Sequence, residues 1–385
     1  MLFYLVIIGI SCFNAEAKSR KCVTRKVEPV RLPCTSVSQV MDIREIARRA
    51  KVSTATVSRA INHVPTVDPQ LAKRVWKVVE ELGYYPNTQA RALVSGRSRI
   101  FGLIISEITN PFFPEIVQVF ERIAVQHQYE ILLTSTGHDP KRVETAVRRM
   151  IERRVDGVAV MTFGMEDLLL EDLKLRKVPL VFADVGIARP HVSNIRIDYL
   201  HGIRQAVQHL AAFRHQKIAF ISGPLRLKSA EARQQAFLRS MEEIRLPVDR
   251  KLLVEGDHTI EGGISALGQL LSGPTRPTAV ICSNDMTALG VMRKSYEDGI
   301  SIPRDLSVIG FDDIRLAQFV LPALTTVQMS QAELARLAFH ALLTEVQREA
   351  PLPNGTEYVL TTHLVLREST HLVPGKTKHA SRRKN

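Results

Sequence analysis

Two patterns of apolar residues divide the chain. Between residues 41 and 98, apolar positions recur every three or four residues, which is typical of short amphipathic helices. From residue 100 onward, apolar runs of strand length alternate with helical stretches, the pattern of βα units around parallel sheets buried on both faces. The runs are FGLII, YEILLT, VDGVAVM, VPLVFA, KIAFIS, LLVEG, TAVICS and LSVIG. The sequence therefore predicts a small all-α unit followed by two doubly wound α/β lobes.

Residues 41–62 have the spacing of two helices joined by a tight turn. The first helix carries an apolar stripe made of Ile43, Ile46, Ala47 and Ala50. Ser53 is placed to cap a second helix, in which Val57 and Ile61 turn inward. A short turn between two such helices indicates a helix-turn-helix.

In a helix-turn-helix the start of the second helix enters the major groove of DNA, so the side chains at that start are candidates for DNA contact. The candidates in this helix are Thr54, Ala55, Thr56, Ser58, Arg59 and Asn62. We expect Thr54, Ala55 and Arg59 to reach base edges, and Thr56 and Ser58 to reach phosphates. Arg59 is the expected guanine contact, because a guanidinium can donate two hydrogen bonds to guanine.

A third helix is predicted to begin at Asp68-Pro69, a capping acid followed by proline, and to end at Gly83. Asn87 can then cap a last short helix, TQARALVSG, whose large apolar residues include Leu93. Because so short a helix is marginal in water, we expect it to order only against DNA or a partner subunit. Leu93 is the expected wedge between base steps in the minor groove.

The whole stretch resembles the head of the lactose/galactose repressor (LacI/GalR) family of bacterial transcriptional regulators. The family's ordered motifs stand here as VSTATVSRAIN, GYYPN and ARALVSG. The resemblance implies that Thr54, Ala55 and Arg59 read the operator in its major groove, and that Ala90 and Leu93 lie in the minor groove at its centre. It also implies a homodimer whose two heads read a near-palindromic operator in double-stranded DNA.

Polar side chains follow most of the apolar runs of the body, at the carboxyl ends of the predicted strands, where doubly wound sheets bind ligands. These positions include Asp184, Arg233, Asp257-His258, Asn284-Asp285 and Asp312-Asp313. We expect Asp and Asn acceptors and an Arg donor to hold a small polar ligand, with Phe112 or Phe113 as an apolar face. A polar residue at a strand end can also cap the next helix; at Asn284-Asp285 both roles are open, and Asp285 suits the cap better.

The body, to about Arg367-Glu368, also resembles the family's sensor domain, which is similar to type I periplasmic sugar-binding proteins. The resemblance lies in NPFF, RRVDGV, RPTAVICSND, GISIPRDLSVIGFDD and PALTTV. Positions that match the family's recurrent effector contacts are Arg233, Asn284 and Asp312. Positions that match contacts varying with the ligand are Phe112, Phe113, Asp184, Ser229 and His258. The implied effector is a sugar or a sugar derivative, and Arg226 and Lys228 point weakly to a sugar acid. We expect no cofactor and no metal.

The net charge of +13 is unevenly distributed. Residues 1–40 hold six Lys/Arg against two Glu, residues 41–98 ten against five acids, and residues 370–385 five against none, so residues 99–369 are nearly neutral. This segregation is typical of a nucleic-acid-binding protein with a neutral sensor. Cys282 is the only cysteine of the body and lies in an apolar run, which suits a reducing compartment. We therefore expect a cytoplasmic, nucleoid-associated protein.

The expected fold is an N-terminal all-α helix-turn-helix head plus an α/β two-lobed, periplasmic-binding-protein-like (type I) sensor domain with parallel sheets. Its head spans residues 41–86, and a hinge helix and linker span 87–98. Lobe 1 comprises about 99–198 and 328–356, and lobe 2 about 199–327 and 357–369. A basic disordered tail, 370–385, follows. Residues 1–40 are expected to be a disordered or upstream extension, since family members begin near Met41. Their first ten residues imitate a secretory signal but are too short to span a membrane.

Two rival classes remain. An exported solute-binding protein of a transporter is favoured by the signal-like start and the two-lobed body, but the basic head argues against it. An enzyme is disfavoured because the chain has no GxGxxG after a strand, no HExxH and no GxSxG, so no catalytic residue is expected. We predict a sequence-specific transcriptional regulator, a repressor by family habit, whose operator affinity is controlled by a small metabolite, with no membrane partner.

Overall fold

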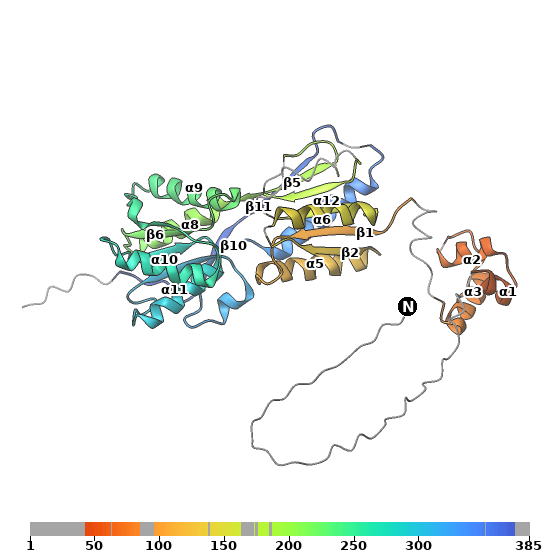
Figure 1. The fold of residues 1–385 in the computed structure, drawn as a ribbon, viewed down its shortest axis with the longest axis horizontal. Helices are drawn as coiled ribbons and strands as arrows, with labels where there is room; N and C mark the ends of the chain where they lie inside the picture. Colours follow the sequence, from red (N-terminus) through yellow and green to blue (C-terminus); the bar gives the residue numbers. More distant parts are fainter. Residues whose placement is uncertain are drawn as a thin grey trace, which may run out of the picture. The chain divides into compact units, whose positions relative to one another are not determined.

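The structure is a computed structural model that describes residues 43–62, 64–84, 96–137, 139–162, 173, 176–184, 187–350 and 352–373. These residues belong to two compact units, one within residues 1–86 and the other within residues 87–385. Figure 1 traces the elements of both units in chain order. The predicted hinge helix lies outside the described residues, as do residues 1–40.

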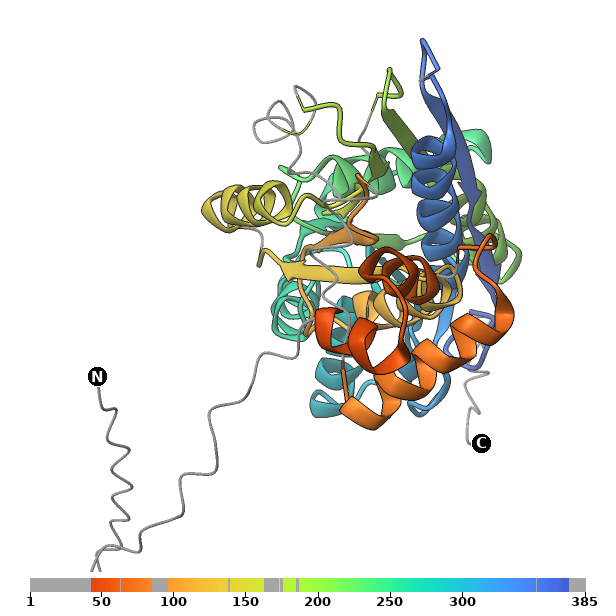
Figure 2. The ribbon, with the colours of Figure 1, turned by 90° about the vertical axis from the view of Figure 1, so that its right-hand side faces the viewer.

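The first unit is a three-helix head (Figure 2). Its helices are α1 (Ile43–Ala50), α2 (Thr54–Ile61) and α3 (Pro69–Leu82). One apolar core joins them; its fully buried members are Ile46, Val57 and Val75. The head thus buries the stripes that the helical spacing predicts.

The helix ends of the head follow from local chemistry. The Ser53 hydroxyl accepts a hydrogen bond from the Thr56 N–H at 3.1 Å and caps α2. Asp68 caps α3 by accepting from two N–H groups, and Pro69 is the first residue of that helix. Gly83 ends α3 with φ of 56°, a left-handed conformation that glycine adopts at little cost. Each of these predicted caps is confirmed.

Lobe 1 of the second unit is a six-stranded sheet in the order β11-β5-β4-β3-β1-β2, in which every pairing is parallel. The strands are β1 (Ile100–Ile105), β2 (Glu130–Ser135), β3 (Gly157–Met161), β4 (Leu180–Ala183), β5 (Val192–Asp198) and β11 (Thr356–Thr361). Helices α5 (Phe112–Gln126) and α12 (Gln331–Gln347) pack with one another against one face, and α6 (Pro140–Glu152) covers the other.

Lobe 2 is a six-stranded sheet in the order β12-β10-β9-β8-β6-β7, with only β12 antiparallel to its neighbour. The strands are β6 (Ile218–Ser222), β7 (Leu253–Glu255), β8 (Ala279–Cys282), β9 (Ser307–Asp312), β10 (Thr325–Gln328) and β12 (His363–Val365). Its helices are α8 (Tyr199–Ala212), α9 (Lys228–Glu243), α10 (Ile260–Ser272) and α11 (Asp285–Glu297), with 3-10 turns at Arg250–Leu252 and Arg315–Gln318. Helices α10 and α11 pack so closely that a Cβ on Gly290 would lie 2.0 Å from the Ile260 carbonyl oxygen.

The structure corrects the expected lobe boundaries. All eight apolar runs form strands, but β5, β10, β11 and β12 were not predicted. Strand β11 pairs with β5, so residues 357–361 belong to lobe 1, and the expected division at 356/357 is wrong. This edge strand alternates exposed residues with more buried ones, and its apolar stretch, residues 358–360, is short. The chain therefore crosses between the lobes three times, after β5, β10 and β11.

The end of the body also differs from expectation. Residues 370–373 were assigned to a disordered tail, yet they are bonded to lobe 2: the His371 N–H donates to the Ser307 hydroxyl at 3.0 Å, and the Val373 N–H donates to the Phe213 carbonyl at 2.9 Å. The rest of the predicted tail lies outside the described residues. Within the described part of the chain, no helix is both long and apolar enough to cross a bilayer.

Candidate functional site

Helix α2 presents the candidate DNA-reading side chains. Thr54, Ala55, Arg59 and Asn62 are exposed, while Thr56 and Ser58 are half-buried. The Thr56 hydroxyl lies 2.9 Å from that of Ser53, so it is held at the capped start of the helix. Ala55 and Arg59 are one helical turn apart and share a face. This face has the small and donor-bearing side chains that a major-groove contact needs.

The charge on α1 is partly neutralised within the helix. The Glu45 carboxylate bonds to Arg48 at 2.6 Å and to Arg49 at 2.8 Å. Hydrogen bonds from these two guanidinium groups lower the pKa of Glu45 to about 2. Two of the outward-facing arginines of α1 therefore share one carboxylate. The remaining DNA-binding candidates, Asn87, Ala90 and Leu93, lie outside the described residues.

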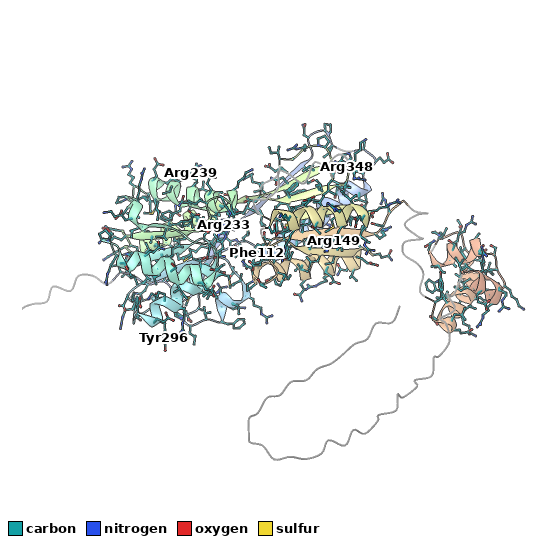
Figure 3. The ribbon with its side chains drawn as sticks, in the orientation of Figure 1. Phe112, Arg149, Arg233, Arg239, Tyr296 and Arg348 are labelled. Carbon is teal, nitrogen blue, oxygen red and sulfur yellow. The ribbon has the colours of Figure 1, made fainter. Side chains whose placement is uncertain are left out.

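A cavity of about 230 Å³ lies between the two lobes of the second unit. Lobe 1 contributes Ser106, Glu107, Asn110, Phe112, Phe113 and Thr162 to its wall. Lobe 2 contributes Leu227, Ser229, Arg233, Asp257, His258, Thr259, Asn284 and Asp312. Figure 3 labels Phe112 and Arg233, which extend from the two lobes toward the space between them. The structure thus brings together seven of the eight predicted effector-binding residues.

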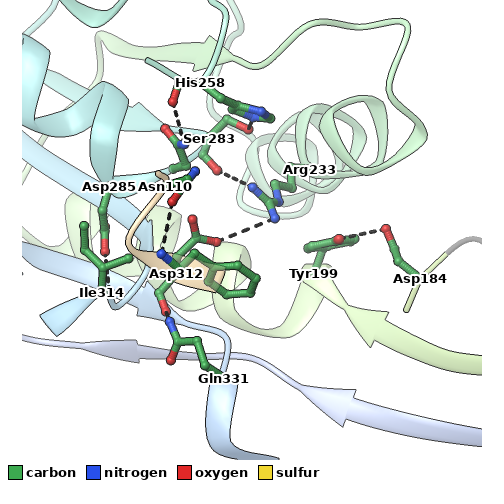
Figure 4. Close-up of polar contacts among 12 residues, drawn as sticks. Asn110, Asp184, Tyr199, Arg233, His258, Ser283, Asp285, Asp312, Ile314 and Gln331 are labelled. Atoms are coloured by element: carbon green, nitrogen blue, oxygen red, sulfur yellow. Dashed lines mark hydrogen bonds and ion pairs between the residues drawn. The ribbon is translucent and has the colours of Figure 1, made fainter. Parts of the chain in front are cut away.

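Arg233 and Asp312 form the buried centre of the cavity wall (Figure 4). The Arg233 guanidinium donates to the Ser283 carbonyl at 2.6 Å and lies 3.7 Å from the Asp312 carboxylate. It also lies over the ring of Phe311, 4.3 Å from its centroid. Among the described residues, Arg233 Nε and Asp312 Oδ1 have no hydrogen-bond partner. A buried donor and a buried acceptor are therefore available at one cavity for a polar ligand.

Asp312 is both strained and electrostatically perturbed. Burial raises the pKa of its carboxyl from 3.8 to about 7, although the positive charge of Arg233 opposes this shift. Its φ of 106° lies in a region that residues with a Cβ rarely adopt. The Gln331 side chain, at the start of α12 in lobe 1, donates to the Asp312 carbonyl at 2.9 Å and ties this residue to the other lobe. Strain and a perturbed pKa in one cavity residue are typical of a binding site.

Asn284, not Asp285, caps α11. The Asn284 side-chain oxygen accepts from the Thr287 N–H at 2.9 Å, and its amide donates to the His258 carbonyl at 3.0 Å. Asn284 thus caps a helix and also lines the cavity. Asp285 is already the first helical residue and points inward, where its carboxylate accepts from the Ile314 N–H at 2.8 Å. The expectation that Asp285 is the cap is therefore wrong.

His258 is positioned by a glycine that the sequence did not single out. Its Nε2 lies 3.0 Å from the Ser283 hydroxyl, with donor and acceptor roles set by the tautomer. A Cβ added at Gly223 would lie 2.0 Å from this same nitrogen. Gly223 therefore makes room for the imidazole beside the cavity.

Asp184 is the one predicted effector-binding residue that the structure does not place in the cavity wall. Its carboxylate instead accepts a hydrogen bond from the Tyr199 hydroxyl at 2.7 Å. The Tyr199 ring lies beneath the Arg233 guanidinium, 5.1 Å from its centroid, and burial raises the pKa of Tyr199 well above its usual value. Asp184 therefore contacts Tyr199, and Tyr199 in turn contacts Arg233. The sequence did not predict Tyr199 as part of the site, because strand β5, which precedes it, was not predicted.

Several other wall residues were not predicted as ligand contacts. These are Ser106, Thr162, Leu227 and Thr259; Glu107, Asn110 and Asp257, which also line the wall, follow predicted strands. Ser106 and Thr162 directly follow β1 and β3, which is the signal that could have found them, whereas Leu227 and Thr259 lie several residues beyond β6 and β7. Arg226 and Lys228 are exposed and are absent from the described wall, while Leu227 between them is buried in it. The described residues include no group of three His, Cys, Asp or Glu side chains placed to hold a metal ion.

Two family models match the chain: bacterial regulatory proteins of the lacI family over residues 42–87, and a periplasmic binding protein-like domain over residues 207–370. Catabolite control protein A of Priestia megaterium is 35% identical over 327 residues, covering 83% of this chain and 98% of that protein. The solved lac repressor dimer bound to operator and the anti-inducer ONPF is 27% identical with a TM-score of 0.76, covering 86% of this chain and 99% of that one. The transcriptional regulator CelR–cellobiose complex is 28% identical with a TM-score of 0.64, at the same coverage.

Proposed function

Because this chain belongs to the lacI family of bacterial regulatory proteins, we propose that its head binds an operator while its two-lobed body binds a metabolite that controls operator affinity. Like its relatives in this family, the protein is a DNA-binding transcriptional regulator. It is not an enzyme. The alternative of a transporter's solute-binding protein is not supported, since the lacI-family match covers the head itself.

The observation that carries the proposal is the cavity shared by the lobes. Lobe 1 supplies Phe112 and Ser106 to its wall, and lobe 2 supplies Arg233 and Asp312. A ligand that contacts both sets of residues favours one arrangement of the two lobes over others. The head is connected to lobe 1 through the segment before Ile100. The ligand can shift operator affinity only by its difference in affinity between these arrangements.

The effector that fits this wall is a sugar or sugar derivative. Hydroxyl groups can both donate to the Asp312 carboxylate and accept from the Arg233 guanidinium, and Phe112 offers an apolar face. Pockets for drug-sized ligands run to about 300–1,000 Å³, so a cavity of about 230 Å³ favours a small ligand. The exposed positions of Arg226 and Lys228 favour a neutral sugar over a sugar acid.

For the DNA side, we assign Arg59 to a guanine, Thr54 and Ala55 to base edges, and Thr56 and Ser58 to phosphates, with Asn62 at the end of the same helix. Asn87, Ala90 and Leu93 are assigned to the hinge and the minor groove by the family resemblance. The division of roles follows the expected domains, with residues 41–86 as the head and 87–98 as the hinge.

We assign the protein to a homodimer on a near-palindromic operator. A family member with 27% identity is a dimer bound to its operator, and two-fold symmetry of a protein matches that of palindromic DNA. A protein of this kind acts in the cytoplasm, at the DNA of the nucleoid.

Two measurements on the full chain test the proposal. Selection from a pool of random duplexes at physiological salt should recover a near-palindromic consensus, and no enrichment would overturn the DNA-binding half. A thermal-shift screen of neutral sugars, sugar acids and nucleobases should find a neutral sugar that raises the melting temperature of the wild type. Asp312→Asn should abolish that shift. The control Asp298→Asn, which removes a surface carboxylate beside Lys294, should keep it. Equal shifts in both variants would overturn the assigned cavity.

A further inference from the structure

Four neighbouring strands of lobe 1 begin within three residues of a basic side chain. Arg99 precedes β1, Arg153 and Arg154 precede β3, Arg176 and Lys177 precede β4, and Arg189 precedes β5. These strands are adjacent in the sheet, in the order β5-β4-β3-β1, and run parallel. Their amino ends therefore lie along one edge, which we call the lobe 1 basic edge and define by these six residues.

All six side chains of the lobe 1 basic edge are exposed. Within the described residues, the acidic groups next to this edge include Asp156, Glu130 and Glu152. Asp156 is half-buried and accepts from the Ser98 N–H at 2.8 Å and the Arg99 N–H at 3.2 Å, so its charge holds the backbone of the entering chain. Glu130 at the start of β2 and Glu152 at the end of α6 are exposed. The edge keeps a net positive charge after these carboxylates are counted.

The last turn of α12 also reaches this edge. The Arg97 guanidinium donates to the Val346 carbonyl at 2.9 Å, which anchors the entering chain to that helix. Near it, Arg348 lies 3.7 Å from the Glu345 carboxylate, and Glu349 follows in sequence. The end of α12 therefore carries both cationic and anionic side chains, and its carboxylates do not neutralise the lobe 1 basic edge.

The opposite edge of the same sheet has a different character. The residues that follow the strands there are Ser106, Thr136, Thr162, Asp184 and Tyr199, and none of them is a cation. That edge faces the effector cavity, through Ser106 and Thr162. The row of cations at the strand ends of lobe 1 therefore lies at the edge away from the cavity, although residues 99–369 as a whole are nearly neutral. The cations that follow the other edge in sequence include Lys141 and Arg142, at the start of α6.

The lobe 1 basic edge is also where the chain from the head enters the body, because Ser98 and Arg99 lead directly into β1. Eleven residues, 85–95, separate the described head from Gly96. Even fully extended, a chain of this length spans roughly 40 Å. A head bound to a duplex therefore holds this edge at high local concentration near the same duplex.

We propose that the lobe 1 basic edge is a second DNA-contact surface, which binds backbone phosphates beside the sequence that the head reads. The proposal rests on the proposed function as a DNA-binding regulator. Adjacent strands lie about 4.8 Å apart, so the row is about 14 Å long. Phosphates on one strand of a duplex follow one another about every 3.4 Å along its axis, so a row of this length laid along the axis spans about four of them. Contacts of this kind add affinity and salt dependence but no sequence preference.

Lobe 2 offers a matched control, because its sheet also has exposed cations at the amino ends of strands. Arg250 and Lys251 precede β7 and are exposed, and the first segment of lobe 1, β1 to β5, separates them from the linker in sequence. The double variant Arg250→Gln/Lys251→Gln removes the same charge as Arg153→Gln/Arg154→Gln. A general effect of net charge would change both variants equally.

The test measures binding of the full-length protein to a fluorescein-labelled, mixed-sequence 40-bp duplex by anisotropy, from 50 to 200 mM KCl. Each phosphate contact contributes about 0.9 to the slope of log K against log salt. We expect Arg153→Gln/Arg154→Gln to lower the slope by about 1–2 and to weaken binding severalfold at 100 mM. Arg250→Gln/Lys251→Gln should match the wild type, and Arg189→Gln should lower the slope by about 1. All variants should retain the wild-type circular dichroism spectrum and melting temperature.

Equal slopes for the wild type and the Arg153→Gln/Arg154→Gln variant would overturn the proposal, and so would equal losses in the lobe 2 control. Failure of the proposed function gives a different result, since selection from random duplexes would then enrich nothing with the wild type. If selection succeeds and the slope is unchanged, only the lobe 1 basic edge is excluded.

Discussion

Replacing Asp312 by asparagine should stabilise the ligand-free protein at neutral pH while removing ligand binding. The carboxyl is 5% exposed, and burial raises its pKa from 3.8 to about 7. A raised folded-state pKa means that ionisation opposes folding. The contribution of this carboxyl to the free energy of unfolding is fully present below about pH 4. It is lost as the pH rises through about 7.

The size of the effect follows from the shift. About three units at 1.36 kcal/mol each give up to about 4 kcal/mol at pH 8. The attraction of Arg233 is already contained in the value of about 7, because that cation lowers the pKa of Asp312. Asparagine has nearly the same shape and carries no charge, so the variant avoids the cost of burying the carboxylate. The two proteins should be equally stable near pH 4, and the variant should become more stable as pH rises.

Urea unfolding between pH 4.5 and 8.5 measures this difference. The chain has a single tryptophan, Trp76 in α3, so tryptophan fluorescence reports the head and far-UV circular dichroism is dominated by the body. The body transition of Asp312→Asn should move to higher urea at pH 8, whereas the tryptophan transition should stay unchanged. Asp298→Asn serves as the surface control. A variant less stable than the wild type at pH 8, or a gap that does not grow with pH, would refute the reasoning.

Three further predictions concern the head and lobe 2. Arg59→Ala should lose about 1–3 kcal/mol of discrimination between the selected duplex and a random one in competition anisotropy, and unchanged discrimination would exclude Arg59 from base contact. Ser53→Ala removes the cap of α2 and should destabilise the head by about 1 kcal/mol in urea unfolding followed by Trp76 fluorescence, with the body transition unaffected. Gly290→Ala places a Cβ 2.0 Å from the Ile260 carbonyl and should destabilise lobe 2 by about 1–3 kcal/mol in circular dichroism melts; a melt like that of the wild type would show that α10 and α11 can move apart.

The sequence predicted those parts of the fold that local chemistry determines. Ser53, Asp68 and Gly83 act through their immediate neighbours in the chain, so their roles as helix caps are readable from spacing alone. The eight apolar runs likewise mark strands, and most of these are buried along their length; β2 and β7, at the sheet edges, are partly exposed. Strand β11 escaped prediction because it lies at a sheet edge and exposes alternate side chains such as Glu357 and Val359, and because its apolar stretch, residues 358–360, is short.

The cavity was predictable where a residue stands at the carboxyl end of a central strand, as Asp312 does at the end of β9. Contacts set by the tertiary fold were not. The sequence does not show that Tyr199 stands between Asp184 and Arg233, since these three residues come from different elements. Nor does it show that Gly223 makes room for His258, because no local conformation of Gly223 requires glycine.

The most direct test of the account is whether the ligand of the cavity changes DNA affinity through Asp312. Anisotropy titrations of the full-length protein on the selected duplex would be run with and without the sugar that gives the largest thermal shift. The operator affinity of the wild type should change by about 5–150-fold, and that of Asp312→Asn should not change. A sugar that binds in the cavity yet leaves the affinity of the wild type unchanged, or alters both proteins equally, would contradict the account.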